Sequence, residues 1–92
     1  MTFQARLRSC MERGNLTIAD LARWLERPHA TVSTWVNDGR VPGGPPATLA
    51  WVEVRLTRLE EAIETATGFP IPAHLAHRAR AIYLKRLKNG RR

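Results

Sequence analysis

Apolar residues recur every three to four positions in the first forty residues, which is the spacing of one face of an α-helix. The repeat breaks twice, so it predicts three helices, at residues 2–13, 17–25 and 29–38. Thr2 is placed to cap the first helix, and Gly14 follows it, as glycine often does at a helix C-terminus. The stripes that these helices would bury are Phe3, Leu7, Cys10 and Met11 in the first, Ile18, Leu21, Ala22 and Leu25 in the second, and Val32, Trp35 and Val36 in the third.

The second and third predicted helices lie close together in the chain. The second begins with Thr17-Ile-Ala-Asp20, a pattern resembling a capping box, in which two side chains satisfy free backbone N–H groups of the first turn. Only Glu26, Arg27 and Pro28 separate it from the third helix. The sequence therefore predicts two short helices joined by a turn of three residues.

The segment 40–46, RVPGGPP, separates these helices from the rest of the chain. Its three prolines and two glycines fit neither a helix nor a central strand. Beyond it, apolar residues recur at alternating spacings of three and four until Gly68, which is the a/d rhythm of a coiled-coil seam. A seam this narrow predicts a long helix packed against another helix. Its members are Leu49, Val52, Leu56, Leu59, Ile63 and Ala66.

A last helix is predicted to begin at Pro72, because proline is favoured at the first helical position. Its apolar residues recur as far as Leu87, so the two C-terminal helices are expected to form a hairpin. No alternation typical of β-strands occurs, and five predicted helices indicate an all-α fold. A chain of 92 residues has room for one small domain, whose limited core a homo-oligomer interface would supplement.

The charge of the chain is positive and unevenly distributed. Fifteen Lys and Arg residues against eight Asp and Glu residues give a net charge of +7, with a pI near 11.3. Seven of these cations and no anion fall in residues 78–92. Such a balance favours a polyanionic partner, without separating DNA from RNA or a membrane surface. The basic end, residues 85–92, is expected either to grip phosphates or to pair with glutamates of the long helix across a dimer.

Other kinds of chemistry have weaker signals. Cys10 is the one cysteine and lies on an apolar stripe, which predicts a small buried residue rather than a disulfide or a reactive thiol. His74 and His77 have no Cys or carboxylate near them in sequence, so we expect neither a metal site nor a cofactor. Aromatic residues at helical spacing are more often core than stacking platforms for bases, and this applies to Trp24, Trp35 and Trp51.

Nothing in the sequence indicates an enzyme or a small-molecule substrate. No nucleophile-and-base arrangement stands out, and Glu60, Glu61 and Glu64 are expected on the outward face of a helix rather than in a pocket. No apolar run approaches the ~20 residues of a membrane span, and the start of the chain lacks the apolar region of a signal peptide. We therefore expect a soluble cytoplasmic protein.

Segment 16–39 carries a pattern with a known counterpart. A capping threonine is followed by a Leu-Ala pair, a Thr-Val-Ser run, a tryptophan, an asparagine and a glycine. This pattern resembles the helix-turn-helix of the Cro and phage-repressor family, the XRE-type transcriptional regulators, and the resemblance covers roughly residues 2–66. The matching residues are Thr17, Leu21, Ala22, Leu25, Thr31, Val32, Ser33, Trp35, Asn37 and Gly39.

The resemblance implies that the third helix enters the major groove of DNA while the second crosses the backbone. Its outward residues are small or polar, and an imidazole, a methyl group or a hydroxyl can each contact base edges. Affinity is then expected to depend on contacts with phosphates. The implied base-reading residues are His29, Ala30, Ser33 and Thr34, and the expected phosphate contacts are Thr17, Arg27, Asn37 and Arg40.

The sequence departs from the family's pattern in four places, one of which is the extra residue Asp38 just before Gly39. The glycine of the family's turn is Glu26 here, and a glutamate with positive φ would be strained. Where the family's turn has an apolar residue, this chain has Arg27. Pro28 follows it, and a proline restricts both its own φ and the backbone of the residue before it. The glutamine that often begins the family's second helix is Ile18, which removes one polar contact with DNA.

These observations predict a sequence-specific regulator that binds double-stranded DNA. The expected form is a homodimeric repressor or autorepressor of phage or mobile-element origin, acting on an inverted-repeat operator in a bacterial cell or phage-infected host. Small autoregulators of anti-CRISPR operons look similar in size and layout. The expected organisation is a helix-turn-helix region at 1–45, an oligomerising hairpin at 46–88 and a basic tail at 89–92. The expected dimer interface is Leu49, Val52, Leu56, Leu59 and Ile63.

Three alternatives stay open at this point. A small terminase-like subunit for DNA packaging would also combine a helix-turn-helix with an oligomerising hairpin, although that family usually carries more chain beyond the hairpin. An RNA-binding adaptor could use the arginine-rich end, but no stacking platform supports it. A plain helical bundle with a short turn would have no nucleic-acid role. The oligomeric state separates repression from packaging, and a preference for duplex over single strands separates both from the adaptor.

Overall fold

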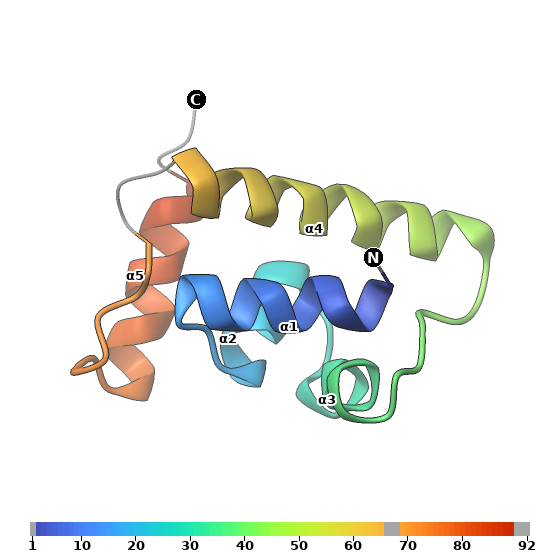
Figure 1. Ribbon diagram of the computed structural model, residues 1–92, viewed down its shortest axis with the longest axis horizontal. Helices are drawn as coiled ribbons and strands as arrows, with labels where there is room; N and C mark the ends of the chain where they lie inside the picture. Colours follow the sequence, from blue (N-terminus) through green and yellow to red (C-terminus); the bar gives the residue numbers. More distant parts are fainter. Residues whose placement is uncertain (1, 66–68, 90–92) are drawn as a thin grey trace.

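The computed structural model describes residues 2–65 and 69–89 (Figure 1). Within these ranges the chain forms five α-helices and no β-strand, so the prediction of an all-α fold with five helices is confirmed. None of these helices is both long and apolar enough to cross a membrane. The helices are α1 (Phe3–Gly14), α2 (Ile18–Leu25), α3 (His29–Asn37), α4 (Pro46–Thr65) and α5 (His77–Asn89).

Local signals determine where the first helices begin and end. The hydroxyl of Thr2 caps α1 by accepting a hydrogen bond from a backbone N–H of the first turn at 3.1 Å. At the start of α2, Thr17 and Asp20 form the predicted capping box, with N···O distances of 3.1 and 2.9 Å. α1 includes Gly14, and the residue that ends it in the left-handed region is Asn15, with φ 53° and ψ 51°. The predicted glycine stop is therefore wrong by one residue, because the asparagine takes the left-handed conformation.

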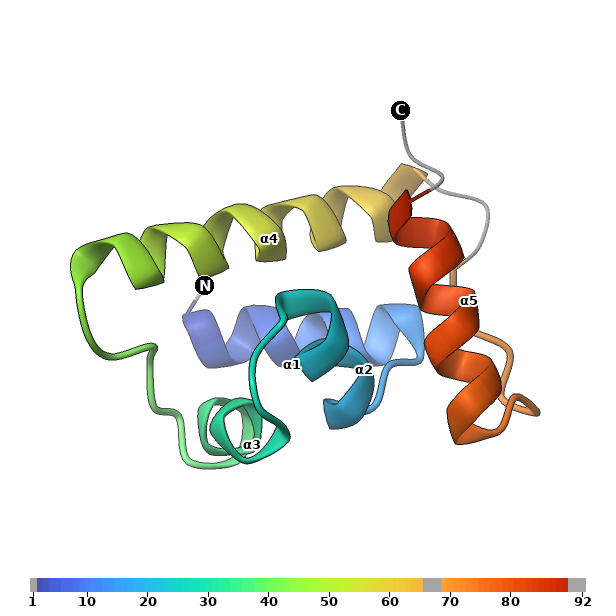
Figure 2. The ribbon, with the colours of Figure 1, turned by 180° about the vertical axis from the view of Figure 1, so that it is seen from behind.

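The long helix α4 runs alongside α1 (Figure 1), and α2, which lies in front of α1 when the molecule is seen from behind (Figure 2), packs against both of them. The α4 side chains Val52, Leu56 and Leu59 are completely buried against α1 and α2. They are the centre of the predicted dimer seam, and the prediction that these three residues contact a second copy is wrong, because helices of the same chain cover them. A narrow apolar seam does need partner helices, and α1 and α2 of the same chain provide them. Of the other seam residues, Ile63 packs at the edge of this core and Leu49 is 39% exposed.

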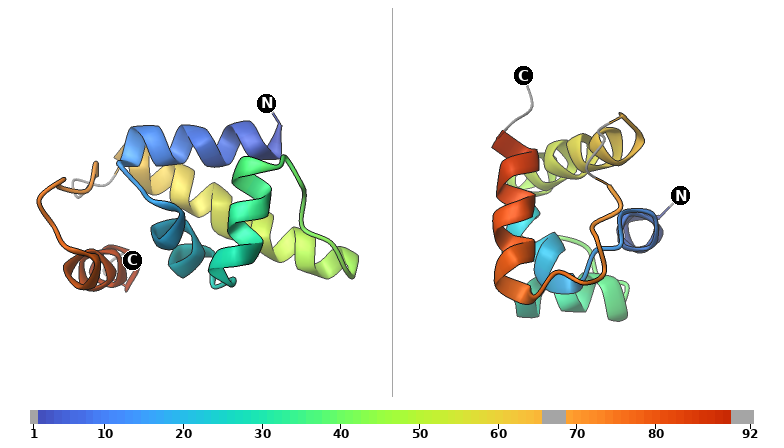
Figure 3. Two further views of the ribbon diagram at one scale, coloured as in Figure 1. Left: turned by 90° about the horizontal axis from the view of Figure 1, so that it is seen from below. Right: turned by 90° about the vertical axis from the view of Figure 1, so that its left-hand side faces the viewer.

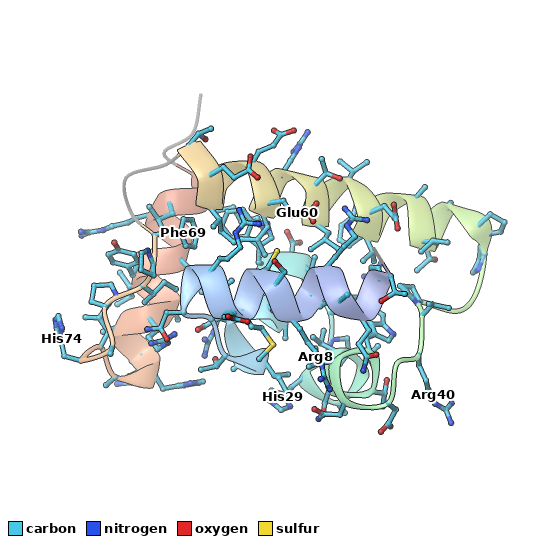
Figure 4. The ribbon with its side chains drawn as sticks, viewed as in Figure 1. Arg8, His29, Arg40, Glu60, Phe69 and His74 are labelled. Atoms are coloured by element: carbon cyan, nitrogen blue, oxygen red, sulfur yellow. The ribbon has the colours of Figure 1, made fainter. Side chains whose placement is uncertain are left out.

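Among the described residues, three ion pairs hold α4 against α1. The guanidinium of Arg6 bonds both carboxylate oxygens of Glu60, at 2.7 and 3.1 Å (Figure 4), and lies 3.4 Å from Glu53, while Arg13 lies 3.4 Å from Glu64. Glu60 is half-buried against α1, whereas Glu61 and Glu64 are exposed, so the prediction of an outward face is wrong for Glu60 and holds for the other two. Three of the α4 glutamates are therefore already paired within the chain.

The last helix differs most from its prediction. α5 begins at His77 and not at Pro72, because residues 71–76 form an extended segment and a turn. The backbone N–H of Ile71 donates to the carbonyl of Gly14 at 2.8 Å, which attaches this segment to the end of α1. From there α5 packs against α2 and not against α4, so the predicted C-terminal hairpin is wrong. The predicted helix end at Gly68, the seam residue Ala66 and residues 90–92 of the basic tail lie outside the described residues.

A buried ion pair attaches α5 to the start of α2. The guanidinium of Arg80 donates to Asp20 Oδ2 from Nε at 3.0 Å and from Nη2 at 2.7 Å. The side chain of Asp20 is fully buried and that of Arg80 is 10% exposed. Nη2 also contacts the carbonyl of Asn15, which satisfies one of the remaining donors. Because Asp20 belongs to the capping box, one carboxylate both starts α2 and positions α5 beside it.

Candidate nucleic-acid interface

The turn between α2 and α3 is tight, and one of its residues has a left-handed backbone conformation. Glu26 has φ 56° and ψ 48°, and its backbone N–H points back to the carbonyls of Ala22 and Arg23. The N–H of Arg27 also donates to the Ala22 carbonyl, at 3.0 Å. Pro28 then precedes α3 with φ −58° and ψ 144°. The sequence left the geometry of this turn open; the structure gives Glu26 a positive φ, a conformation that costs a glutamate about 1–2 kcal/mol.

The side chain of Glu26 connects this turn to two other helices. Its carboxylate accepts from Lys88 of α5 at 2.8 Å and from Arg55 of α4 at 2.7 Å. The hydrogen bond from Lys88 is the largest cause that lowers the pKa of Glu26 below its usual range. These ion pairs offset part of the backbone strain, and they hold the turn between α4 and α5.

Helix α3 separates an apolar face from a polar one. Val32, Trp35 and Val36 are buried, as the sequence predicts, and Phe3 of α1 packs edge-on against Trp35 with ring centroids 5.6 Å apart. The opposite side of α3 lies at the lower edge of the molecule (Figures 1 and 3), where no other described helix covers it. The helix therefore presents one complete polar face to an outside partner.

The predicted base-reading residues lie together on this face. His29 is exposed at the start of α3 (Figure 4), with Ala30 exposed next to it. Ser33 and Thr34 are half-buried one turn later. The Thr34 hydroxyl donates to the carbonyl of Thr31 at 2.7 Å, so within the free protein its proton is used and its lone pairs remain available to accept.

The predicted phosphate contacts differ in how they are placed. Arg40 is exposed and extends from the edge of the molecule just beyond α3 (Figure 4). Asn37 is exposed and donates to Ser33 Oγ at 3.1 Å. Thr17 uses its hydroxyl for the capping box of α2. Arg27 is half-buried, with its guanidinium carbon 4.3 Å from the centre of the Trp51 ring, so its charge is directed toward α4.

Sequence reasoning missed Arg8 of α1. Its Nε donates to the carbonyl of Val36 at 3.1 Å, and Gln4, one turn earlier, donates to the same carbonyl at 2.9 Å. Both side chains thus satisfy the C-terminal end of α3, and Arg8 remains exposed beside it (Figure 4). The polar pair at spacing four in α1 is the only signal in the sequence, and it does not say which helix the pair contacts.

The three tryptophans have two different environments. Trp24 and Trp35 are each 4% exposed, so the expectation of core positions is confirmed for both. Trp51 is 37% exposed, but the guanidinium of Arg55 lies over its ring at 3.8 Å, with that of Arg27 at 4.3 Å. Cations therefore already occupy the ring on which a base would have to stack.

Metal and thiol chemistry find little support in the described ranges. Residues 2–65 and 69–89 contain no group of three potential metal ligands. His74 extends away from the body of the protein (Figure 4), and His77 instead contacts Arg23 of α2. Cys10 is completely buried, as predicted, and this burial raises the pKa of its thiol to about 11.

Compared with protein-family models, with curated proteins and with solved structures, the chain has no match.

Proposed function

We propose that this protein is a transcriptional regulator that binds double-stranded DNA, with α3 lying in the major groove. The observation that carries this proposal is the polar face that α3 presents to solvent. The opposite face of α3 is buried and entirely apolar, and a tight turn precedes the helix. An α-helix fits the width of the major groove, and its first residues are the ones that reach base edges. His29, Ala30 and Thr34 are the proposed readers.

Phosphate contacts are proposed at the C-terminal end of α3. Arg40 follows the helix, and Arg8 lies against its C-terminal carbonyls. A cation placed there can bond a phosphate while the neighbouring residues contact bases. With no arginine on α3 itself, most of the affinity is expected from such contacts and from the net charge of +7. Occupying a promoter in this way represses its gene, and the protein's own promoter is the first candidate.

We further propose that two copies bind an inverted repeat, with half-sites about one helical turn apart. Each chain has one such face, so a single copy covers one half-site. Because the α4 seam fills the chain's own core, another surface must join the two copies.

The test is fluorescence anisotropy on the DNA upstream of the protein's own gene and on a scrambled duplex of equal length, with light scattering on the same samples. The wild type is expected to prefer its own upstream DNA by ~10³ or more. Thr34→Ala should reduce this preference. Arg40→Ala should weaken binding to both duplexes and lower the salt slope by about one. Arg58→Ala is the charge-matched control, because it removes the same charge from an exposed position on α4.

Three outcomes would count against the proposal. No binding to either duplex would refute it. Equal, steeply salt-dependent binding to both would leave only electrostatic attraction and remove the regulatory role. A ring of eight or more copies on DNA would instead support a packaging subunit.

A further inference from the structure

An open groove lies on the same face of the molecule as α3. Its floor is α2, with Ala19 and Ala22 at the bottom, and its two sides are His29 at the start of α3 and His77 at the start of α5. The view from below shows α2 between these two helices, and α5 begins on this face (Figure 3). The groove thus extends from the proposed base-reading residues to a helix that the sequence did not place near them.

The groove carries unneutralised positive charge. Arg23 lines it, and its guanidinium is held between Asp20 Oδ1 at 3.4 Å and the ring of His77. The Asp20 carboxylate is buried and already paired with Arg80, so it offsets little of the Arg23 charge at the surface. Glu26 also lines the groove, but Lys88 and Arg55 bind its carboxylate.

The first turn of α5 adds a second cation. Arg78 is exposed, and no other residue of the described ranges pairs with its guanidinium. It lies two positions before the buried Arg80, which places it on the side of α5 that faces away from the core. Arg78 does not line the groove itself; it is exposed on the first turn of α5, directly after His77, which does.

We propose that this groove holds one sugar-phosphate backbone of the duplex whose bases α3 reads. Arg23 and Arg78 contact neighbouring phosphates, and His77 is a positioning residue that accepts a hydrogen bond from Arg23. The inference rests on the proposed function and extends it to α5. Cations and alanine methyl groups line the groove, and they bind phosphate and sugar regardless of base identity. The contact therefore raises affinity for every sequence equally.

The experiment uses a scrambled duplex, because the contact is independent of sequence, and measures anisotropy between ~50 and ~200 mM salt. Arg23→Ala and Arg78→Ala are each expected to weaken binding about fivefold and to lower the salt slope by about one. Arg58→Ala is the matched control, because it removes the same charge from an exposed position on α4, outside the residues that line the groove. It should leave both quantities unchanged.

The role of His77 is tested by two variants. His77→Ala should weaken binding less than Arg23→Ala, and His77→Gln should restore it, because an amide oxygen can accept the same hydrogen bond. The variants leave the buried Asp20–Arg80 pair intact, so we expect them to fold. Circular dichroism on each variant verifies that the helices persist.

Each contrary outcome identifies a different error. If Arg58→Ala weakens binding as much as Arg78→Ala, diffuse charge accounts for the effect and the groove contact is wrong. If the wild type binds duplex and Thr34→Ala alters its preference, but Arg23→Ala and Arg78→Ala change nothing, this inference alone fails. If the wild type binds no duplex, the proposed function fails first.

Discussion

Replacing Asp20 by alanine is expected to destabilise the protein more than any surface change, because it leaves a buried cation without its counterion. The Asp20 carboxylate accepts hydrogen bonds from Arg80 at 2.7 and 3.0 Å and from the backbone N–H of Thr17 at 2.9 Å. Removing one partner of a buried ion pair costs about 3–5 kcal/mol, and the lost cap adds about 1 kcal/mol. A small domain has only about 5–15 kcal/mol of stability in total. Asp20→Ala is therefore expected to lose a large share of it.

Urea unfolding, followed by far-ultraviolet circular dichroism and tryptophan fluorescence, measures this loss. Asp20→Asn keeps an acceptor for Thr17 and should fall between the wild type and Asp20→Ala, so a value is obtained even if the alanine variant does not fold. Arg23→Ala is the internal control, because it removes the outer partner of the same carboxylate, at 3.4 Å and with a side chain 31% exposed. Exposed ion pairs contribute about 1 kcal/mol or less.

A double variant separates the ion pair from the rest of the site. Arg80→Met removes the cation that Asp20→Ala leaves unpaired, so the combination should be more stable than Asp20→Ala alone. If Asp20→Ala unfolds within 1 kcal/mol of the wild type, or if Arg80→Met gives no recovery, the reasoning that this pair attaches α5 to α2 is refuted.

Three further predictions address the core, the thiol and the turn. Leu59→Ala should cost about 2–5 kcal/mol of stability in urea unfolding, since Leu59 is 0% exposed within one chain; dissociation of an oligomer with unchanged unfolding would contradict this. Cys10, with its pKa raised to about 11 by burial, should resist alkylation at about pH 8 in the folded protein and react once urea unfolds it; rapid labelling of the folded protein would show an accessible thiol. The lowered pKa of Glu26 means that its contribution to stability is present above the unfolded pKa of about 4.3 and is lost as the pH falls through the folded value. The difference in urea midpoint between wild type and Glu26→Gln should therefore shrink below that pH, and a constant difference would argue against the ion pairs with Lys88 and Arg55.

The first three helices could be predicted because their signals are local. A threonine with an aspartate three residues later specifies the start of α2, and the apolar spacing of Val32, Trp35 and Val36 specifies which face of α3 is buried. The comparison of residue types raised the question of strain at Glu26 but left the geometry of the turn open, and the structure shows a positive φ there. The exposed candidate residues of α3 were predictable for the same reason, because the residues outside the buried stripe must face outward.

The placement of α4 and α5 could not be read in this way. The seam around Leu56 showed that one face of α4 is buried, but periodicity does not say whether the partner belongs to the same chain or to another. The position of α5 depends on Arg80 meeting Asp20, sixty residues earlier, and on Lys88 meeting Glu26. No local pattern encodes contacts at such separations. Arg8, Arg23 and the groove were missed because each depends on two helices being side by side.

The net charge of +7 does not show how unevenly positive charge is distributed over the surface of the protein. In the described ranges most carboxylates are paired inside the protein, so they hold helices together rather than repel an anionic partner. Cations that are left without such a carboxylate include Arg8 and Arg40 beside α3 and Arg78 at the start of α5. The Debye length in physiological salt is only about 8 Å. A polyanion is therefore attracted mainly through charges that it can approach closely. Arg8, beside α3, and Arg58, on α4, each line a surface hollow together with a glutamate, Glu12 and Glu61, so neither cation acts without a neighbouring negative charge.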